Sequence, residues 1–380
     1  MTSICFSFQV HQPTLLSDYD FFQIGHTHAY FDHSDNQNRE GFIIDERCNS
    51  YNKKFIDIIK QSQGHFKASF SISGTALDQL TDYHHNLQHS FKQMVETGCV
   101  EMLCQPYYHS LSYLYSTKEF QRQVILHREA IQEKFQVSPK IFRNTETVYG
   151  NDIARTVEEM GFLGILSDGT DSLLMGRSAN HIYLPLGTRR IRALLKNQSL
   201  SADLAVNFFN STWVNYPLTP VKFVEWIKKQ AKNGDSTINL FLDYSIFSQP
   251  SFLPFLEKLV LEVLKNKELD FKTPSEVLDT YPVKGTYDVP YSASWAEVGK
   301  DLPGWMENYL QREAIERIYR LEDAIKAQGD EELLLSWSNL QTADHFYRMS
   351  NQEPKRYDAY INYMNILTDL EQQVKNSASD

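Results

Sequence analysis

The sequence predicts an α/β fold in which a barrel of parallel β/α units is followed by a helical region. Short apolar runs typical of buried strands alternate with longer runs of helical character up to about residue 280. Beyond that point only helical patterns follow. The chain has 380 residues, which is enough for a barrel of roughly 250 to 300 residues and an appended region.

Seven apolar runs are predicted to form the strands of the barrel. They are Ile4–Val10, Phe66–Ile72, Val100–Leu103, Lys140–Arg143, Phe162–Leu166, Leu204–Phe209 and Ile238–Leu242. Helical segments separate successive runs, and strands joined in this way pair in parallel. The seven strands are therefore expected to lie side by side in one sheet.

Several helices between these strands have readable ends. Ser116–Glu119 and Thr273–Glu276 each place a Ser or Thr three residues before a Glu, which is the pattern of a capping box. Thr219 is followed by Pro220, a residue favoured at the first position of a helix, and this segment is expected to close at Gly234. These signals support the alternation of strands and helices.

From residue 281 onward the strand signals stop and three amphipathic runs take over: Met306–Lys326, Glu331–Arg348 and Lys355–Val374. No Gly/Ser-rich or Pro-rich linker precedes them. We therefore predict a barrel of residues 1–285 and an α-helical region of residues 286–380 that packs directly on the barrel.

The composition excludes some classes of partner. The net charge of −11, with basic residues spread among acidic ones, argues against binding to nucleic acid. No run approaches eighteen apolar residues, and the amino terminus lacks the pattern of a signal peptide, so we expect a cytoplasmic protein that does not bind membranes. The four cysteines, which form no CxxC pair, are predicted to be reduced packing residues.

Polar side chains follow the predicted strands where the barrel would form its functional rim. Glu146 comes shortly after the run 140–143, and Asp243 directly follows the run 238–242. Cleavage of a glycosidic bond needs two carboxyl groups, one to attack or stabilise the anomeric carbon and one to protonate the leaving oxygen. Glu146 and Asp243 are the candidate pair. The alternative for Glu146 is a carboxylate stabilised by the dipole of a helix at 151–160.

Five short motifs in chain order resemble those of glycoside hydrolase family 57, and the similarity is greatest to its α-amylase branch. They are His11-Gln12-Pro13, Phe142–Glu146, Phe241–Tyr244, Asp301–Trp305 and Leu340–Tyr347. Each motif is weak alone, but their order on a chain of suitable length is specific.

This resemblance implies an incomplete (β/α)7 barrel followed by a helical domain. It implies cleavage of α-1,4-glucans with retention of configuration, with Glu146 as nucleophile and Asp243 as general acid/base. The two carboxyl groups would then lie about 5–5.5 Å apart. The expected partner is an α-glucan or maltooligosaccharide. No cofactor and no metal are expected, and the oligomeric state is not predicted.

Further residues are candidates for contacts with the sugar. Pyranose rings stack on aromatic side chains, while histidine and amide groups bind hydroxyls. The candidates are His11, Gln12, His109, Trp295, Trp305, His345 and Tyr347. For each of them the alternative is a satisfied residue of the core.

Two departures from the family pattern lie near the predicted site. After Asp243-Tyr244 the α-amylase branch usually continues with Glu-Thr-Phe-Gly, whereas this chain has Ser245, Ile246, Phe247 and Ser248. Gln105 stands where the family more often has Glu. Both changes remove negative charge, which puts efficiency and substrate in question more than the fold.

Three other functions stay open at this point. A 4-α-glucanotransferase shares the first half of the reaction with a hydrolase. A catalytically weak homologue that only binds glucan would fit the residues after Asp243. A metal-dependent polysaccharide deacetylase would use an imidazole pair such as His85 and His89, one helical turn apart, although the glutamate of a HExxH site is missing.

Overall fold

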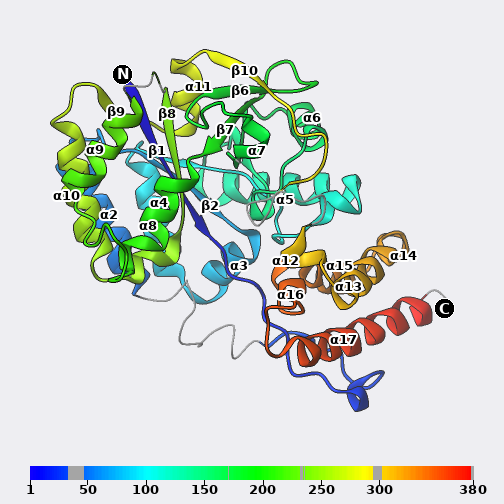
Figure 1. Cartoon of the computed structure of the whole chain (residues 1–380). Coiled ribbons are helices and arrows are strands. Elements are labelled where there is room, and N and C mark those ends of the chain that lie inside the picture. Colours follow the sequence, from blue (N-terminus) through cyan, green and yellow to red (C-terminus); the bar gives the residue numbers. More distant parts are fainter. Residues whose placement is uncertain (33–46, 170, 232–233, 235, 294–301, 378–380) are drawn as a thin grey trace.

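The structure, a computed structural model, describes residues 1–32, 47–169, 171–231, 234, 236–293 and 302–377. Seven parallel strands form a nearly closed barrel with helices on its outside, and a helical region follows it in the chain (Figure 1). The predicted fold class is confirmed.

The barrel closes through strands that pair in parallel around a ring. Its members are β1 (Thr2–Val10), β2 (Ala68–Ile72), β3 (Val100–Met102), β4 (Ile141–Arg143), β5 (Gly164–Asp168), β7 (Arg192–Lys196) and β8 (Thr237–Asp243). β1 pairs with both β2 and β8 over long registers. By contrast, β3 meets β4 only at the bridge Cys104–Phe142, and β7 meets β8 only at the pair Lys196–Asn239. The barrel is therefore weakly joined at two seams.

Three further strands extend the sheet beyond this ring. β6 (Ile182–Pro185) pairs antiparallel with β7, and β10 (Val283–Tyr287) pairs parallel with β6. β9 (Leu269–Phe271) pairs parallel with β1. The expectation that strands stop at residue 281 is therefore wrong, because β10 follows that position.

The predicted strand Leu204–Phe209 is also wrong. This stretch holds the end of helix α8 (Gln198–Ala205) and the short 3-10 helix η4 (Asn207–Phe209). The Asn197 side chain accepts a hydrogen bond from the Leu200 amide at 3.0 Å and so caps α8. The strand that completes the barrel is β7, which has three apolar residues between its charged ends, whereas the run 204–209 that was predicted instead is more apolar.

Helices cover the outside of the barrel, and most connect consecutive strands. They are α2 (Cys48–Gln61), α3 (Gly74–Tyr83), α4 (His85–Glu96), α5 (Thr117–Phe135), α6 (Asn151–Glu159), α7 (Asp171–Leu174), α8, α9 (Pro220–Ala231), α10 (Phe252–Leu264) and α11 (Pro274–Thr280). The Thr273–Glu276 capping box of α11 is confirmed, whereas at α5 only Ser116 acts as a cap, accepting from the Glu119 backbone amide, because the Glu119 side chain binds Arg122. α9 begins at Pro220 as predicted but ends three residues before Gly234.

The carboxyl-terminal region is helical, but its runs are broken into more helices than predicted. They are α12 (Pro303–Met306), α13 (Tyr309–Arg320), α14 (Glu322–Gln328), α15 (Glu331–Leu340), α16 (Ala343–Tyr347) and α17 (Arg356–Ser377). Asn308 caps α13, and Asp330 caps α15 after Gly329, whose φ is +70°. These caps fix where α13 and α15 begin, whereas the breaks inside the predicted runs fall at Leu321 and at Gln341–Thr342.

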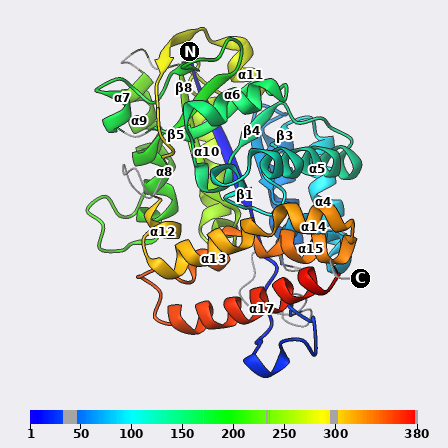
Figure 2. The same ribbon diagram turned by 90° about the vertical axis from the view of Figure 1, so that its right-hand side faces the viewer.

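α17 lies on the side of the helical region that faces away from the barrel (Figure 2). The loop that follows β1 reaches across to it. The Tyr19 amide donates to Asn362 at 2.7 Å, and Asn365 donates to the Tyr19 carbonyl at 3.0 Å. The first and last parts of the described chain are thus held together.

One apolar cluster runs from the barrel into the helical region. It joins Phe120 and Phe142 to Trp337 and Phe346, all fully buried. The predicted boundary at 285/286 stays a prediction, and β10 runs across it. The four cysteines are buried free thiols, as predicted.

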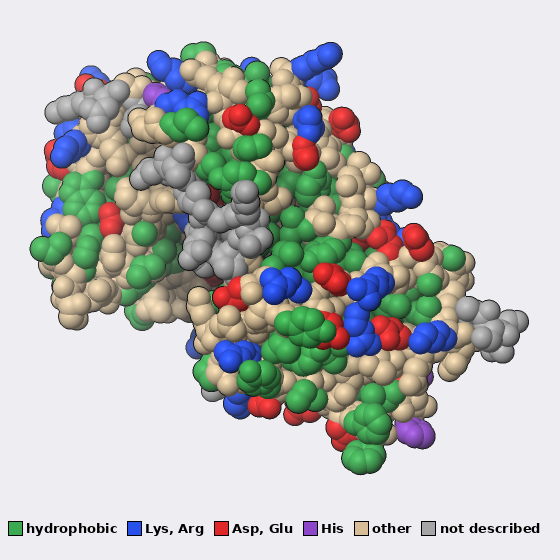
Figure 3. Space-filling model, turned by 45° about the vertical axis from the view of Figure 1, so that its right-hand side comes forward, with side chains coloured by type: hydrophobic (Ala, Val, Ile, Leu, Met, Phe, Trp, Pro, Cys, Tyr) green, Lys and Arg blue, Asp and Glu red, His purple; other side chains and the backbone are tan. Residues whose placement is uncertain are grey.

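The distribution of surface charge and the length and polarity of the helices can be compared with the expectation that the chain binds neither nucleic acid nor membranes. On the face shown in Figure 3, Lys and Arg side chains are interspersed with Asp and Glu side chains. Within the described ranges, every helix is too short or too polar to cross a membrane. The cytoplasmic location stays a prediction.

Candidate active site

A cavity of about 200 Å³ lies where β1, β4, β7 and β8 end at their carboxyl termini. It is lined by Gln9, Arg143, Glu146, Thr147, Lys196, Ala205, Phe241, Leu242 and Asp243. The structure therefore brings Glu146 and Asp243, the two candidate catalytic residues, to one cavity at the rim of the barrel.

Glu146 occupies an unusual backbone conformation. It lies in the 3-10 turn η3 (Thr145–Thr147) with φ +51° and ψ 27°, in the left-handed region that few non-glycine residues adopt. The side-chain Nδ2 of Asn144 donates to the Val148 carbonyl at 2.9 Å, and the Thr147 hydroxyl donates to the Asp168 carboxylate. This turn holds the Glu146 side chain at the cavity, ahead of helix α6.

Asp243 ends β8, and the residue is exposed. Its Oδ1 accepts from the Ser245 amide at 2.8 Å, which caps the 3-10 helix η5 (Tyr244–Ser248). Among the residues that depart from the family pattern, Ile246 and Phe247 are buried, and Phe247 packs on Phe8 with ring centroids 4.9 Å apart. The departures therefore fill the core next to Asp243.

The other departure, Gln105, is fully buried. Both atoms of its side-chain amide lack a hydrogen-bond partner among the described residues. A buried amide without partners is rare because it has lost water without replacement. The change at this position leaves a polar group in the barrel without a visible structural role.

His109 contacts Glu146 directly. Its Nε2 lies 3.1 Å from Glu146 Oε1 and 3.4 Å from Gln9 Nε2. Burial lowers the pKa of His109, and His11 lowers it further, while the contact with Glu146 opposes both effects. Because a carboxylate only accepts, the neutral imidazole donates its Nε2 proton to Glu146.

His11 stacks on His109, with ring centroids 3.9 Å apart and an angle of 24° between the planes. Its Nδ1 lies 2.8 Å from the Ser73 hydroxyl, and its Nε2 lies 2.8 Å from Asp344 Oδ2. Burial opposes ionisation of Asp344, but His11 outweighs it and holds the pKa of that carboxyl well below its ordinary value. A carboxylate of the helical region thus reaches the rim of the barrel.

The segment that carries Asp344 is fixed to the barrel through its backbone. Ser110 and Thr342 form an antiparallel bridge. The Ala343 amide also donates to the His109 carbonyl at 3.0 Å. Asp344 and His109 are therefore placed by the same backbone bridge.

His11, His109 and Asp344 could hold a metal ion by distance, since their ligand atoms lie within 4.8 Å of one another. However, both nitrogens of His11 and the Nε2 of His109 already face Ser73, Asp344 and Glu146. A metal would have to displace these contacts. The arrangement favours a hydrogen-bonded array that orients Glu146.

The remaining predicted contact residues lie elsewhere. The Gln12 amide is buried and donates to Gln79. Trp305 is buried in α12 and packs on the half-buried Tyr347, with ring centroids 6.0 Å apart. Trp295 lies outside the described residues. None of the described residues in this group lines the cavity of Glu146 and Asp243.

His345 lines a different cavity, of about 570 Å³, between α16, α17 and the loop after β1. Burial lowers its pKa to about 4, so the imidazole is neutral near pH 7. His85 and His89, the imidazole pair considered for a metal site, are exposed on α4 and do not line the cavity of Glu146 and Asp243.

Sequence reasoning missed two cationic residues of the cavity. Arg143 is buried, and burial lowers its pKa, whereas Glu146, Asp168 and Asp243 oppose that effect. Lys196 ends β7, and its Nζ lies 3.8 Å from Asp168 Oδ1. Arg143 stood inside a quoted motif, but Lys196 belongs to the strand that was not predicted.

Replacement of Asp344 by Asn is expected to destabilise the protein in a pH-dependent way. The pKa of Asp344 is lower in the folded than in the unfolded chain, so its ionised form contributes stability above its ordinary pKa of about 4. This contribution is lost as the pH falls toward the folded value. Urea denaturation of wild type and Asp344→Asn should show a difference in the free energy of unfolding at pH 7 that shrinks below about pH 4. A difference that does not change with pH would contradict the pairing with His11.

Comparisons with known proteins show what this chain is similar to. A model of glycosyl hydrolase family 57 matches residues 5–290. A protein of Methanocaldococcus jannaschii named "Putative alpha-amylase" is 30% identical over 403 residues, covering 98% of this chain and 85% of that protein.

Two solved structures share the fold. The α-amylase AmyC from Thermotoga maritima superposes with a TM-score of 0.71 at 12% identity, covering 100% of this chain and 94% of that one. A 4-α-glucanotransferase from Thermococcus litoralis superposes with a TM-score of 0.63 at 14% identity, covering 91% of this chain. This chain spans 56% of the length of that glucanotransferase.

Proposed function

The chain belongs to glycoside hydrolase family 57, and from this premise we propose that it is an α-amylase-like enzyme that cleaves α-1,4-glucans with retention of configuration. Glu146 is the nucleophile, and Asp243 is the general acid/base. The observation that carries the proposal is that these two carboxyl groups line one cavity at the rim of the barrel. Two carboxyl groups at one site are what retaining hydrolysis requires.

The reaction proceeds in two displacements. Asp243 donates its proton to the glycosidic oxygen while the Glu146 carboxylate attacks the anomeric carbon, so the bond to the leaving chain breaks and a glycosyl ester forms. Asp243 then removes a proton from water, which attacks the same carbon and releases Glu146. Two inversions give retention.

The surroundings of Glu146 suit a nucleophile. The imidazole of His109 donates to its carboxylate, and the buried guanidinium of Arg143 favours its ionised form. A carboxylate held in this way attacks in a single orientation. Asp344, which contacts His11 next to His109, has a partly exposed carboxylate that can accept a hydrogen bond from a sugar hydroxyl.

Product analysis of maltoheptaose in H₂¹⁸O tests the proposal and separates it from glucan transfer. A hydrolase yields shorter oligomers that carry ¹⁸O at the new reducing end and are first released as the α-anomer. A transferase also yields longer oligomers, because a sugar hydroxyl replaces water as the acceptor.

The controls for this experiment are two variants. Glu146→Gln should be inactive, whereas Glu159→Gln, which changes an exposed carboxylate on α6, should behave as wild type. Binding of maltoheptaose by a folded wild type that forms no product at all would reject the catalytic proposal in favour of a binding protein.

A further inference from the structure

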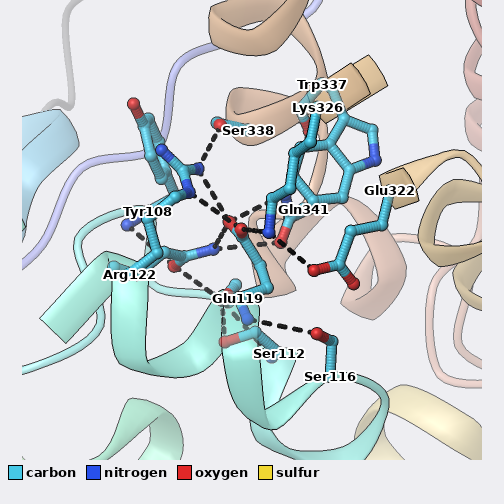
Figure 4. Close-up of polar contacts among 12 residues, drawn as sticks. Tyr108, Ser112, Ser116, Glu119, Arg122, Glu322, Lys326, Trp337, Ser338 and Gln341 are labelled. Atoms are coloured by element: carbon cyan, nitrogen blue, oxygen red, sulfur yellow. Dashed lines mark hydrogen bonds and ion pairs between the residues drawn. The ribbon is translucent and has the colours of Figure 1, made fainter. Parts of the chain in front are cut away.

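A buried carboxylate outside the cavity joins the barrel to the helical region (Figure 4). Glu119 lies in the first turn of α5, and its side chain is fully buried. Arg122 donates to both carboxylate oxygens, from Nε at 2.8 Å and from Nη2 at 2.7 Å. Lys326 of α14 lies 2.8 Å from Glu119 Oε2 and also pairs with Glu322 at 2.6 Å.

The charges of this cluster balance, with two carboxylates and two cations. Burial would raise the pKa of Glu119, but the hydrogen bonds and charge of Arg122 and the contact with Lys326 outweigh it and lower that pKa. Glu119 is therefore ionised although it is buried. Such a charge is tolerated only while its partners stay in place.

Two amide side chains connect this carboxylate to the segments that flank the active site. Gln123 Nε2 donates to Glu119 Oε1 and to Gln341 Oε1, both at 2.9 Å, and Gln341 Nε2 lies 3.3 Å from Glu119 Oε1. On its other side, Gln123 Oε1 accepts from the Ser110 hydroxyl at 2.8 Å. Glu119 thus orients the side-chain amides of Gln123 and Gln341, and Gln123 in turn binds the Ser110 hydroxyl.

Ser110 follows His109 in the chain, and Gln341 precedes Asp344 by three residues. The bridge between Ser110 and Thr342 joins the segment of His109 to the segment of Asp344. His109 has φ +50°, a strained backbone that persists only when its surroundings determine it tightly. The Glu119 cluster contacts both segments through Gln123, which binds Ser110 and Gln341, and so helps to hold this backbone conformation.

We propose that Glu119 is a positioning residue of the active site. Its ion cluster sets the segments at Ser110 and Gln341, and through them it places His109 against Glu146 and Asp344 against His11. The effect on catalysis rests on the proposed function, whereas the placement of the imidazoles does not.

The test compares Glu119→Gln with Glu371→Gln. The control breaks the bidentate ion pair of Glu371 on α17 with Arg317 on α13, at 3.0 and 2.8 Å. Among the described residues, these two side chains form no hydrogen bond or ion pair with residues 109–110 or 341–344. With maltoheptaose, Glu119→Gln should lower kcat by about 10- to 100-fold, because small displacements of catalytic groups have effects of that size. KM should change much less, and Glu371→Gln should keep the wild-type kcat.

A second readout does not depend on turnover. In protein labelled with ¹⁵N-histidine, long-range proton–nitrogen spectra report the hydrogen bonds of each imidazole, with His11 and His109 assigned through single variants. Glu119→Gln should shift the nitrogen resonances of both rings, and Glu371→Gln should not. If wild type does not cleave maltoheptaose, the proposed function fails while this readout still decides the placement.

Gln341→Met covers the case in which Glu119→Gln does not fold. It keeps every charge of the cluster and removes only the amide that links Glu119 and Gln123 to the Asp344 segment. It should lower kcat and shift the same imidazole resonances. Unchanged imidazole resonances in the folded variants, or equal losses of kcat in Glu371→Gln, would overturn the proposal.

Discussion

Glu146→Gln is expected to lower kcat/KM for maltoheptaose by about 10⁴-fold or more. The amide has nearly the shape of the carboxylate but cannot form the glycosyl ester, so the path with the lower barrier is lost. The His109 contact can still form, since an amide oxygen accepts as a carboxylate does. Initial rates from chromatography of the products measure the effect, with Glu159→Gln as the matched control.

Azide distinguishes a lost nucleophile from a damaged site. In Glu146→Ala the anion can enter the space of the missing carboxylate, attack the anomeric carbon while Asp243 protonates the leaving oxygen, and give the β-glycosyl azide. Formation of that product places Glu146 on the face opposite the leaving group. An α-glycosyl azide from this variant would exclude Glu146 as the nucleophile.

Asp243→Ala is expected to slow cleavage of maltoheptaose by about 10²- to 10⁴-fold, the usual range for loss of a general acid. The loss should depend on the leaving group. A maltoside with a nitrophenolate leaving group needs no proton, so its first step should stay near the wild-type rate while release of the ester becomes slow. Rapid mixing should then show a burst of nitrophenolate.

Azide should accelerate the second step in Asp243→Ala and yield the α-glycosyl azide, because it attacks the ester on Glu146 from the side where water would enter. This configuration is opposite to that expected from Glu146→Ala. Asp279→Asn, which changes an exposed carboxylate on α11, is the matched control. An equal loss with both kinds of leaving group would contradict the role of Asp243.

The sequence predicted the parts of the fold whose signals are local. β1 and β8 are long buried strands, so the position of Asp243 at the end of β8 could be predicted, and Glu146 was placed at the same rim because it follows the shorter run of β4. β7, with three apolar residues between Arg192 and Lys196, was not predicted, because the more apolar run 204–209 was predicted in its place. Leu204 and Phe208 are buried on helices, where a short apolar run does not reveal its period.

The rest of the site depends on contacts that no local pattern reports. His11 and Asp344 meet although they are 333 residues apart in the chain. Trp305 and His345 lie in motifs that matched the family, yet they are buried and do not line the cavity of Glu146 and Asp243. Motif matching identified which segments matter, whereas the direction of each side chain follows from packing between the two parts of the molecule.

His109, Glu146 and Thr147 have left-handed backbone conformations, which lower thermal stability at positions that the active site requires. A residue with a Cβ atom is less stable in this conformation than glycine by on the order of 1 kcal/mol. Selection for heat resistance alone would therefore favour glycine at these positions, and at His109 or Glu146 such a variant would lack the imidazole or the carboxylate. A more thermostable variant should therefore keep these three residues and carry its substitutions away from the active-site rim of the barrel.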